Sequence, residues 1–243
     1  MSEKFSEVEI VPGYKTNMTK TMNLSSLFQD MLVVSEHQLQ TAGIDSENLV
    51  KNIGIGWVVI KYHMDVKRMP NIFEKIRLTT SAETYNKFFC YRNFSVKSED
   101  GTELVKVKSI WTMMSIAKRR MVPVHKDIMD KLNCVYSADV EHFPRIPRVE
   151  FDDKLTKDYR TRFFDIDVNG HVNNTVYFDW MLDTLNKDFL LQHQIKTMDI
   201  KYDLEVHYGE TVNSKLKIDD DLTTHHQIES DTGLNAQALF TWK

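Results

Sequence analysis

Two short segments of this 243-residue chain recur later in the same order, and this repeat constrains the fold more than any other feature. Residues 60–66 have the sequence IKYHMDV and residues 200–206 have IKYDLEV, at an offset of 140. Upstream, FQDML at 28–32 matches FDWML at 178–182, at an offset of 150. Because repeats of this kind mark duplicated structural units, we predict two copies of one domain. The offsets differ by ten residues, so the first copy carries a longer connection, which we place near residues 46–56.

The hydrophobic periodicity predicts a helix at the start of each copy. Apolar residues in the first copy follow the i, i+3, i+4, i+7, i+8 spacing of one helix face, at Leu24, Leu27, Phe28, Met31 and Leu32. Asn23 or Ser25 can cap this helix with a side-chain oxygen. In the second copy, residues 172–189 are apolar over more than one stripe. This pattern indicates one long helix that is buried on several sides.

Strand-like runs follow each predicted helix, and turn residues separate the last two runs of each copy as a hairpin requires. The runs are 57–64, 76–84, 88–97 and 104–115 in the first copy, and 199–207, 212–218, 223–229 and 236–242 in the second. A helix followed by an antiparallel sheet that wraps it is an α+β architecture. We expect an N-terminal domain at 1–124, a linker with a short helix at 125–150, and a C-terminal domain at 151–243.

Charge and cysteine content exclude several functional classes. The formal net charge of −4 argues against a dedicated nucleic-acid binder, which needs a basic surface. Two cysteines are too few for a disulfide scaffold and fit a reducing compartment. The acidic start has no signal-peptide pattern, and the longest apolar stretches fall far short of the roughly 20 residues that span a bilayer. We therefore expect a cytoplasmic protein without membrane insertion.

The densest polar cluster, DIDVNGHVNN at 165–174, lies directly ahead of the second predicted helix. Asn169-Gly170 is a strong turn signal, so His171 should lie where the loop meets the helix. Free amides there, with the Asp167 carboxylate, the Asn169 amide and the imidazole, could polarise a carbonyl. The alternative is that Asp167 and Asn169 only form the turn and that His171 is a surface residue.

The first copy differs from the second at these positions. Asn17, Thr19 and Thr21 stand at the 150-residue offset from Asp167, Asn169 and His171. A turn required only by the fold should look similar in both copies, so we expect one competent site per chain.

Glu205 lies in the repeated IKY strand of the second copy, on the strand face opposite to Tyr202. An exposed carboxylate on a strand explains it equally well from spacing alone. Asp65, its counterpart at the 140-residue offset, is also present in the copy that has no histidine.

Other chemistries find no support in the sequence. The chain has no Gly-x-Ser-x-Gly elbow, phosphate loop or dinucleotide fingerprint. His225 and His226 are adjacent, and neighbours on a strand face opposite sides, so they cannot bind one ion together. We expect no metal and no cofactor, and we interpret Cys90 and Cys134 as core or surface residues.

The run RFFDIDVNGHVNNTVYFDWML at 162–182 resembles the signature of the acyl-acyl carrier protein thioesterases, and KYDLEV at 201–206 resembles that family's second motif. The resemblance covers nearly the whole chain and favours the bacterial branch. It implies two tandem hotdog domains, each an antiparallel sheet around a long central helix. It further implies a hydrolase of fatty acid biosynthesis and lipid metabolism, which releases a fatty acid from acyl carrier protein.

Residue roles follow from the same resemblance. Asn169 and His171 would bind and polarise the thioester carbonyl, Asp167 would orient them, and Glu205 would act as general base on water or position it. Many plant members have a cysteine after the glutamate, and Val206 stands there in this chain. This departure leaves direct hydrolysis by water. The family also implies that the first domain holds the acyl chain, and apolar candidates are Met31, Leu32, Trp57, Val59 and Phe89.

The implied partner, acyl carrier protein, is acidic and needs a basic docking surface. Arg160, Arg162, Arg119 and Arg120 are the candidates, although a solvated charge run also explains them. An acyl-CoA thioesterase and a non-catalytic acyl-binding protein stay open as alternatives. Hotdog domains pair through their sheets, which a tandem chain can do internally, so a monomer and a homodimer are both open.

Overall fold

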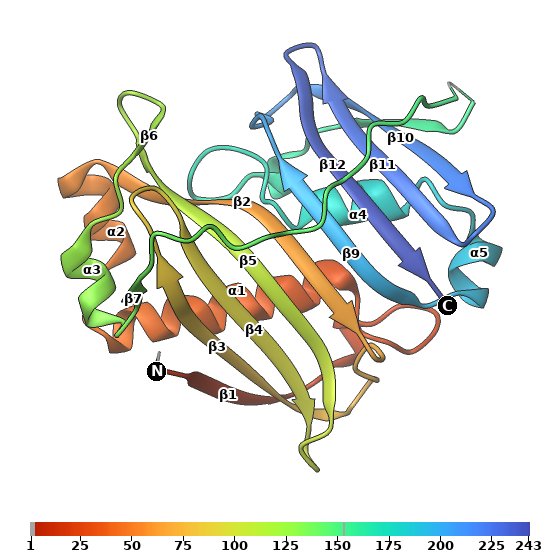
Figure 1. Ribbon diagram of the computed structural model, residues 1–243. Helices are drawn as coiled ribbons and strands as arrows, with labels where there is room; N and C mark the ends of the chain where they lie inside the picture. The colour runs from red at the N-terminus through yellow and green to blue at the C-terminus, as the bar shows by residue number, and fades with distance from the viewer. Residues whose placement is uncertain (1–2, 153) are drawn as a thin grey trace.

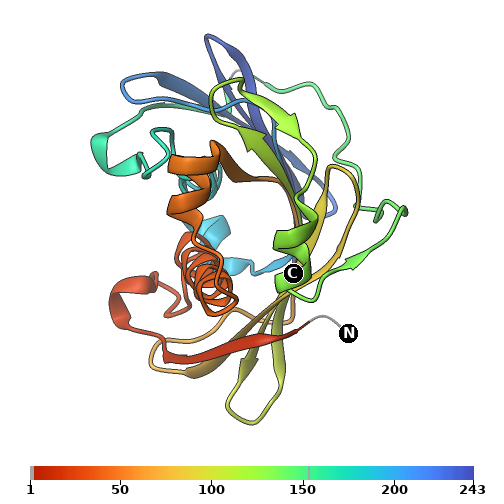
Figure 2. The ribbon, with the colours of Figure 1, turned by 90° about the vertical axis from the view of Figure 1, so that its left-hand side faces the viewer.

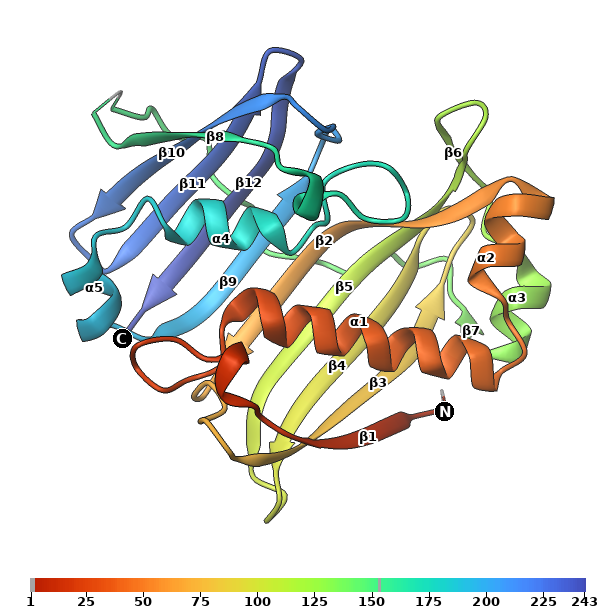
Figure 3. The same ribbon diagram turned by 180° about the vertical axis from the view of Figure 1, so that it is seen from behind.

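The computed structural model describes residues 3–152 and 154–243 and has an α+β architecture. One antiparallel sheet runs through the molecule in the order β1-β3-β4-β5-β2-β9-β12-β11-β10-β8, with β6 paired to β5 and β7 paired in parallel to β3. Figure 1 shows that the sheet divides into two lobes, and Figure 3 shows the main helices of both lobes on the same face.

The first half contains β1 to β7 and three helices. Its strands are β1 (Phe5–Ile10), β2 (Ile55–Val66), β3 (Lys75–Tyr85), β4 (Cys90–Ser98), β5 (Glu103–Ser115), β6 (Arg120–Val122) and β7 (Val135–Tyr136). Its helices are α1 (Leu24–Thr41), α2 (Ser46–Asn48) and α3 (Lys126–Lys131), with single turns η1 (Gly13–Lys15) and η2 (Leu49–Ile53). The extra connection expected near 46–56 therefore forms α2 and η2.

The second half is smaller. Its strands are β8 (Thr156–Arg160), β9 (Ile195–Tyr202), β10 (Thr211–Asp219), β11 (Thr223–Ser230) and β12 (Gly233–Trp242). Its helical segments are η3 (Phe163–Asp165), α4 (Val176–Leu182) and α5 (Lys187–Gln192).

The helix α1 lies against the concave face of the sheet, which curves around it (Figure 2). The predicted apolar face is buried, with Leu27, Phe28 and Met31 each at most 1% exposed. Asn23 occupies the N-cap position, but its side chain makes no capping hydrogen bond. The predicted start of the helix is correct, and the predicted cap bond is wrong.

The prediction of one long helix in the second half is wrong. The helix α4 ends at Leu182, and the Thr184 hydroxyl donates to the Met181 carbonyl over 2.6 Å. Asn186 then accepts a hydrogen bond from the Phe189 amide at 2.8 Å and caps the separate helix α5. After Leu182 the backbone hydrogen bonds tighten to the i to i−3 pattern, from Thr184 to Met181 and from Leu185 to Leu182, and the side chain of Asn186 then starts a separate helix.

The two halves join where the repeated IKY segments meet. Residues 61–65 of β2 pair antiparallel with 197–201 of β9, which makes the sheet continuous. On the concave side, the Phe28 ring lies 4.8 Å from the Tyr62 ring and 4.7 Å from the Phe178 ring. One apolar cluster therefore spans both halves, and burial of its aromatic rings stabilises their association.

The connection between the halves crosses the outer face of the sheet (Figure 1). The Lys61 ammonium donates to the Pro144 carbonyl over 2.7 Å, which attaches the connection to β2. The short helix expected near 125–132 is present as α3. The exact domain boundaries stay a prediction.

Cys90 and Cys134 are buried free thiols, and they lie near enough to each other that Cys134 lowers the pKa of Cys90. The sequence left a core and a surface position open for both cysteines and could not predict that the two lie near each other, because β4 and the segment after α3 are distant along the chain. No helix among the described residues is long and apolar enough to cross a membrane.

Candidate active site

The polar cluster of the second half forms a closed turn that ends at His171. Ile166 and Val172 make an isolated antiparallel bridge. Between them, the Asp167 amide donates to the His171 carbonyl and the Gly170 amide donates to the Asp167 carbonyl, each over 3.0 Å. Gly170 has φ of 85°, which a glycine adopts without steric cost. The predicted Asn-Gly turn is therefore present.

The Asp167 carboxylate is used within this turn. Its Oδ1 accepts a hydrogen bond from the Asn169 amide at 2.8 Å. Asn169 is exposed, and among the described residues no hydrogen bond involves its side chain. The backbone geometry therefore places Asp167, Asn169 and His171 on one short loop, with the carboxylate of Asp167 fixing its shape.

The same turn recurs in the first half. Asn17 Oδ1 accepts from the Thr19 amide at 2.9 Å, and the Asn17 amide donates to the Thr21 carbonyl over 3.0 Å. Thr16 and Met22 form the matching isolated bridge. A turn that only the fold requires should look alike in both copies. Asn17 accepts the same backbone hydrogen bond as Asp167, so this role of Asp167 meets that expectation. The imidazole of His171 has no counterpart in that turn.

Glu205 lies in a loop and not in a strand, which corrects the prediction. The strand β9 ends at Tyr202 because Asn235 interrupts the ladder. The Asn235 carbonyl accepts from the amides of Asp203 and Leu204 at 2.8 and 3.3 Å, and its side-chain amide donates to the Glu205 carbonyl over 3.4 Å. The strand-face argument for Glu205 therefore does not apply.

One backbone hydrogen bond brings this loop to the turn. The Val172 amide donates to the Val206 carbonyl over 2.8 Å. As a result, His171 Nε2 lies 3.7 Å from Glu205 Oε1, and the side chains are 22% and 35% exposed. Both groups can reach one water molecule from solvent.

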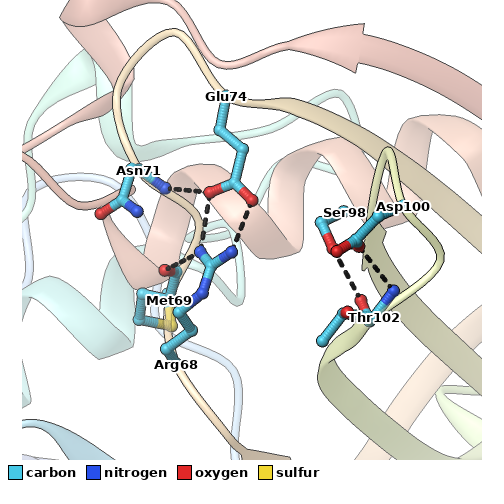
Figure 4. A network of polar contacts seen from close by, with 7 residues as sticks. All are labelled: Arg68, Met69, Asn71, Glu74, Ser98, Asp100 and Thr102. Carbon is cyan, nitrogen blue, oxygen red and sulfur yellow. Dashed lines mark hydrogen bonds and ion pairs between the residues drawn. The ribbon is translucent and has the colours of Figure 1, made fainter.

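The structural counterpart of Glu205 in the first half is Met69, not Asp65. The Met22 amide donates to the Pro70 carbonyl over 2.8 Å, as Val172 does to Val206. Figure 4 shows this loop, where the Asn71 amide donates to Glu74 Oε2 over 2.8 Å. Glu210 accepts from the His207 amide in the same way at 3.0 Å. Asp65 lies within β2, opposite Thr197, so the first half lacks both the histidine and the carboxylate.

The prediction of free amides at the start of the second helix is wrong. The helix α4 begins only at Val176, five residues after His171. The Thr175 amide donates to Oδ1 of Asn173 over 2.9 Å, and the Val176 amide donates to the Asn173 carbonyl over 3.0 Å. The Phe178 amide donates to the Thr175 carbonyl over 3.3 Å. The first turn therefore offers few amides to an oxyanion.

Arg119 enters the site from the first half. It ends the turn between β5 and β6, and its guanidinium forms an ion pair with Glu205 Oε2. The sequence predicted Arg119 as a carrier-docking residue, and no local pattern could show a contact across 86 positions. Its place in the site could therefore not be found from the sequence.

Arg162 also has a partner. Its Nη2 lies 2.6 Å from Oδ1 of Asp165, whose side chain is 2% exposed. Burial opposes ionisation of Asp165, but hydrogen bonds and charge from Arg162 outweigh it and lower the pKa of that carboxyl. Arg120 and Arg160 are exposed and make no ion pair with any residue that the structure describes.

Tyr177 lies beneath the site and stays protonated. Burial raises the pKa of its hydroxyl far above the ordinary value, and the negative charges of Glu205 and Glu210 add to the effect. Its ring contacts Tyr202 edge-on at 5.4 Å. The Tyr202 hydroxyl donates to the Asn174 carbonyl over 3.0 Å. The two tyrosine rings therefore pack against each other, and Tyr202 is attached to the chain just after His171.

Two small hollows lie elsewhere on the molecule. One of about 60 Å³ lies between β1 and α1, and one of about 220 Å³ lies beside the β2–β9 junction. Neither is lined by His171 or Glu205. The described residues contain no group of three or more side chains placed to hold a metal ion. Met31 and Val59 are buried in the core, and the residues that would line an acyl-chain pocket stay a prediction.

Comparison with protein families gives two matches that together span most of the chain. Residues 2–132 match the acyl-ACP thioesterase N-terminal domain and residues 149–243 match the acyl-ACP thioesterase C-terminal domain. Among curated proteins, the chain is 22% identical to the chloroplastic oleoyl-acyl carrier protein thioesterase of Coriandrum sativum over 95% of its own length. It spans 64% of the length of that relative.

Two solved structures also resemble this chain over nearly its whole length. A Lactobacillus plantarum protein provisionally named oleoyl thioesterase is 35% identical, with a TM-score of 0.95 over 100% of this chain and 96% of the other. An acyl-ACP thioesterase from Bacteroides thetaiotaomicron is 19% identical, with a TM-score of 0.87 over 99% and 98%. The second likeness supports the hotdog fold that the sequence predicted.

Proposed function

The chain belongs to the acyl-ACP thioesterase family, and we propose that it hydrolyses acyl-ACP to a free fatty acid and holo carrier protein. The relatives named above act on acyl-ACP or carry the name of an oleoyl thioesterase. The observation that carries the proposal is the 3.7 Å contact between His171 and Glu205, which only the second half contains.

The proposed reaction is attack of water on the thioester carbonyl. Glu205 accepts a proton from the water. The imidazole of His171 and the side-chain amide of Asn169 together polarise the carbonyl. A positioned general base contributes about 10² to 10⁴ in rate, and donors directed at the oxyanion contribute a comparable amount. The carbon–sulfur bond breaks, and the thiolate of the carrier's prosthetic arm takes up the proton that Glu205 accepted from water, which restores the Glu205 carboxylate. Val206 excludes a covalent thiol intermediate at the position after Glu205.

Asp167 has a positioning role in this proposal. Its carboxylate accepts a hydrogen bond from the backbone amide of Asn169. This bond fixes the loop that presents the side chains of Asn169 and His171. We assign binding of the acidic carrier protein to Arg160, Arg162 and Arg120, and Arg160 is the most available because it is exposed and makes no ion pair with any described residue. We also place the enzyme in the cytoplasm, because the two neighbouring cysteines are free thiols.

The test is a free-thiol assay with long-chain acyl-ACP across chain lengths. His171→Ala and Glu205→Ala should each lower kcat/KM by at least about 10²-fold while the far-ultraviolet spectrum and melting temperature stay near those of the wild type. Full activity in both variants would reject these two residues as the catalytic pair. Equal or faster turnover of acyl-CoA would favour coenzyme A esters as substrate, and absence of turnover with binding of both would indicate an acyl-binding protein.

A further inference from the structure

Arg119 lies at the end of a turn whose backbone fixes where its side chain leaves the first half. The strands β5 and β6 pair Ser115 with Arg120, so residues 116–119 form the connection. Arg119 has φ of 47°, in the left-handed region that residues other than glycine rarely adopt. Such conformations persist only where the surrounding structure enforces them, and they cluster at functional sites.

The two oxygen atoms of the Glu205 carboxylate have different partners. The guanidinium binds Oε2, and His171 Nε2 faces Oε1. Among the described residues, no other side chain forms a hydrogen bond or ion pair with this carboxylate. A glutamate in an exposed loop has several rotamers available, so the guanidinium fixes which oxygen faces the imidazole.

We infer that Arg119 is a positioning residue for Glu205, supplied by the first half to the reaction of the second half. The inference rests on the proposed function and adds a residue to it. It also assigns Arg119 a role different from carrier docking: an arginine held by Glu205 is beside the reacting thioester, whereas docking residues contact the carrier surface. The active site is then incomplete in either half alone.

The kinetic experiment compares Arg119→Ala and Arg119→Lys with Lys118→Ala, which removes the same charge from the same turn. Arg119→Ala should lower kcat about tenfold with acyl-ACP and acyl-CoA alike, and leave KM nearly unchanged. Arg119→Lys should recover part of the loss because the ammonium can still reach the carboxylate. Lys118→Ala should keep the wild-type kcat. In a Glu205→Gln background, Arg119→Ala should cause no further loss.

The opposite pattern would overturn the inference. A rise in KM for acyl-ACP alone, shared by Arg119→Ala and Arg120→Ala, would return Arg119 to docking. If Arg119→Ala lowers kcat as much in the Glu205→Gln background as in the wild type, Arg119 acts independently of Glu205.

A structural readout keeps the inference separate from the proposed function. Crystal structures of the wild type and the Arg119→Ala variant should differ in the Glu205 rotamer, so that Oε1 of Glu205 no longer faces Nε2 of His171 in the variant. If these two atoms stay as close in the variant as in the wild type, the inference is overturned even where the wild type hydrolyses acyl-ACP. If the wild type does not hydrolyse thioesters but the rotamer changes, the proposed function fails and the positioning role stands.

Discussion

The imidazole of His63 in β2 lies 2.9 Å from the carboxylate of Asp199 in β9, so a charged pair joins the two halves of the sheet. The hydrogen bond that His63 donates to the Asp199 carboxylate raises the pKa of His63 above its ordinary value of 6.5, burial opposes this shift, and Asp65 supports it. A raised pKa means that the folded protein holds the proton more tightly than the unfolded chain. The pair therefore stabilises the fold fully below pH 6.5, and this stabilisation disappears as the pH rises through the folded pKa.

Replacing His63 by Gln should remove that pH dependence. Urea unfolding between about pH 5.5 and 8.5 should show the largest difference in free energy of unfolding between wild type and variant at the acid end. His37→Gln is the matched control, because His37 also meets a carboxylate, Glu7, but with side chains 45% and 37% exposed. Water screens such a pair. A constant difference for His63→Gln across this range would contradict the assignment.

His226 should produce the opposite pH dependence. Burial first, and then the neighbouring His225, lower the pKa of His226 to about 3. Between about pH 6 and pH 4 the unfolded chain binds a proton at His226 that the folded protein does not, so His226 should contribute a slope of about 1.4 kcal/mol per pH unit to the free energy of unfolding, which falls as the pH falls. The slope should disappear in His226→Gln and persist in His142→Gln, whose histidine is exposed. An unchanged slope in the first variant would show that another group causes acid unfolding.

The turn at Asn17 in the first half shows which substitution of Asp167 should preserve the turn in the second half. Asn17 forms the same turn with an amide oxygen, so Asp167→Asn should keep the loop and stay within about threefold of the wild-type kcat/KM. Asp167→Ala removes the acceptor of the Asn169 backbone amide and should lower kcat/KM about fivefold, because loss of such a bond costs roughly 1 kcal/mol. The thiol-release assay measures both. If Asp167→Asn is as impaired as Asp167→Ala, the negative charge takes part in the reaction.

The repeat and the turn could be predicted because each is encoded locally. The IKY segments lie at the junction between the halves, and the Asn169-Gly170 turn is closed by hydrogen bonds within residues 167–171. Proximity of Glu205 to His171 followed from the resemblance and agrees with the 3.7 Å contact. These features depend on a few adjacent residues or on a pattern that recurs.

The features that could not be predicted depend on residues far apart in the sequence. Asn235 ends β9 before Glu205, and Arg119 reaches Glu205 from the other half. The sequence offset points to Asp65 as the counterpart of Glu205, because β2 continues from its IKY segment to Val66, whereas β9 ends at Tyr202, and a sequence offset does not locate such an insertion. Only the hydrogen bond from Met22 to Pro70 identifies Met69 as that counterpart.

Charge reversal at Arg162 would not test carrier docking cleanly. Its guanidinium binds the buried carboxylate of Asp165, so its loss leaves that acceptor without its main partner. We expect any Arg162 variant to be less stable as well as slower. Arg160 in β8 has no such contact among the described residues and gives the sharper experiment.

Arg160→Glu should raise KM for acyl-ACP about tenfold and leave the kinetics with acyl-CoA within about twofold, because only the carrier presents an extended acidic surface. The effect should shrink as salt is added, since exposed charges are screened within about 10 Å at 0.1 M ionic strength. Lys108→Glu, an equal charge change at an exposed position of β5, serves as the control and should raise neither KM. Steady-state kinetics with both substrates at two salt concentrations measure all of these values. Equal losses with both substrates would place Arg160 near the thioester and not at the carrier.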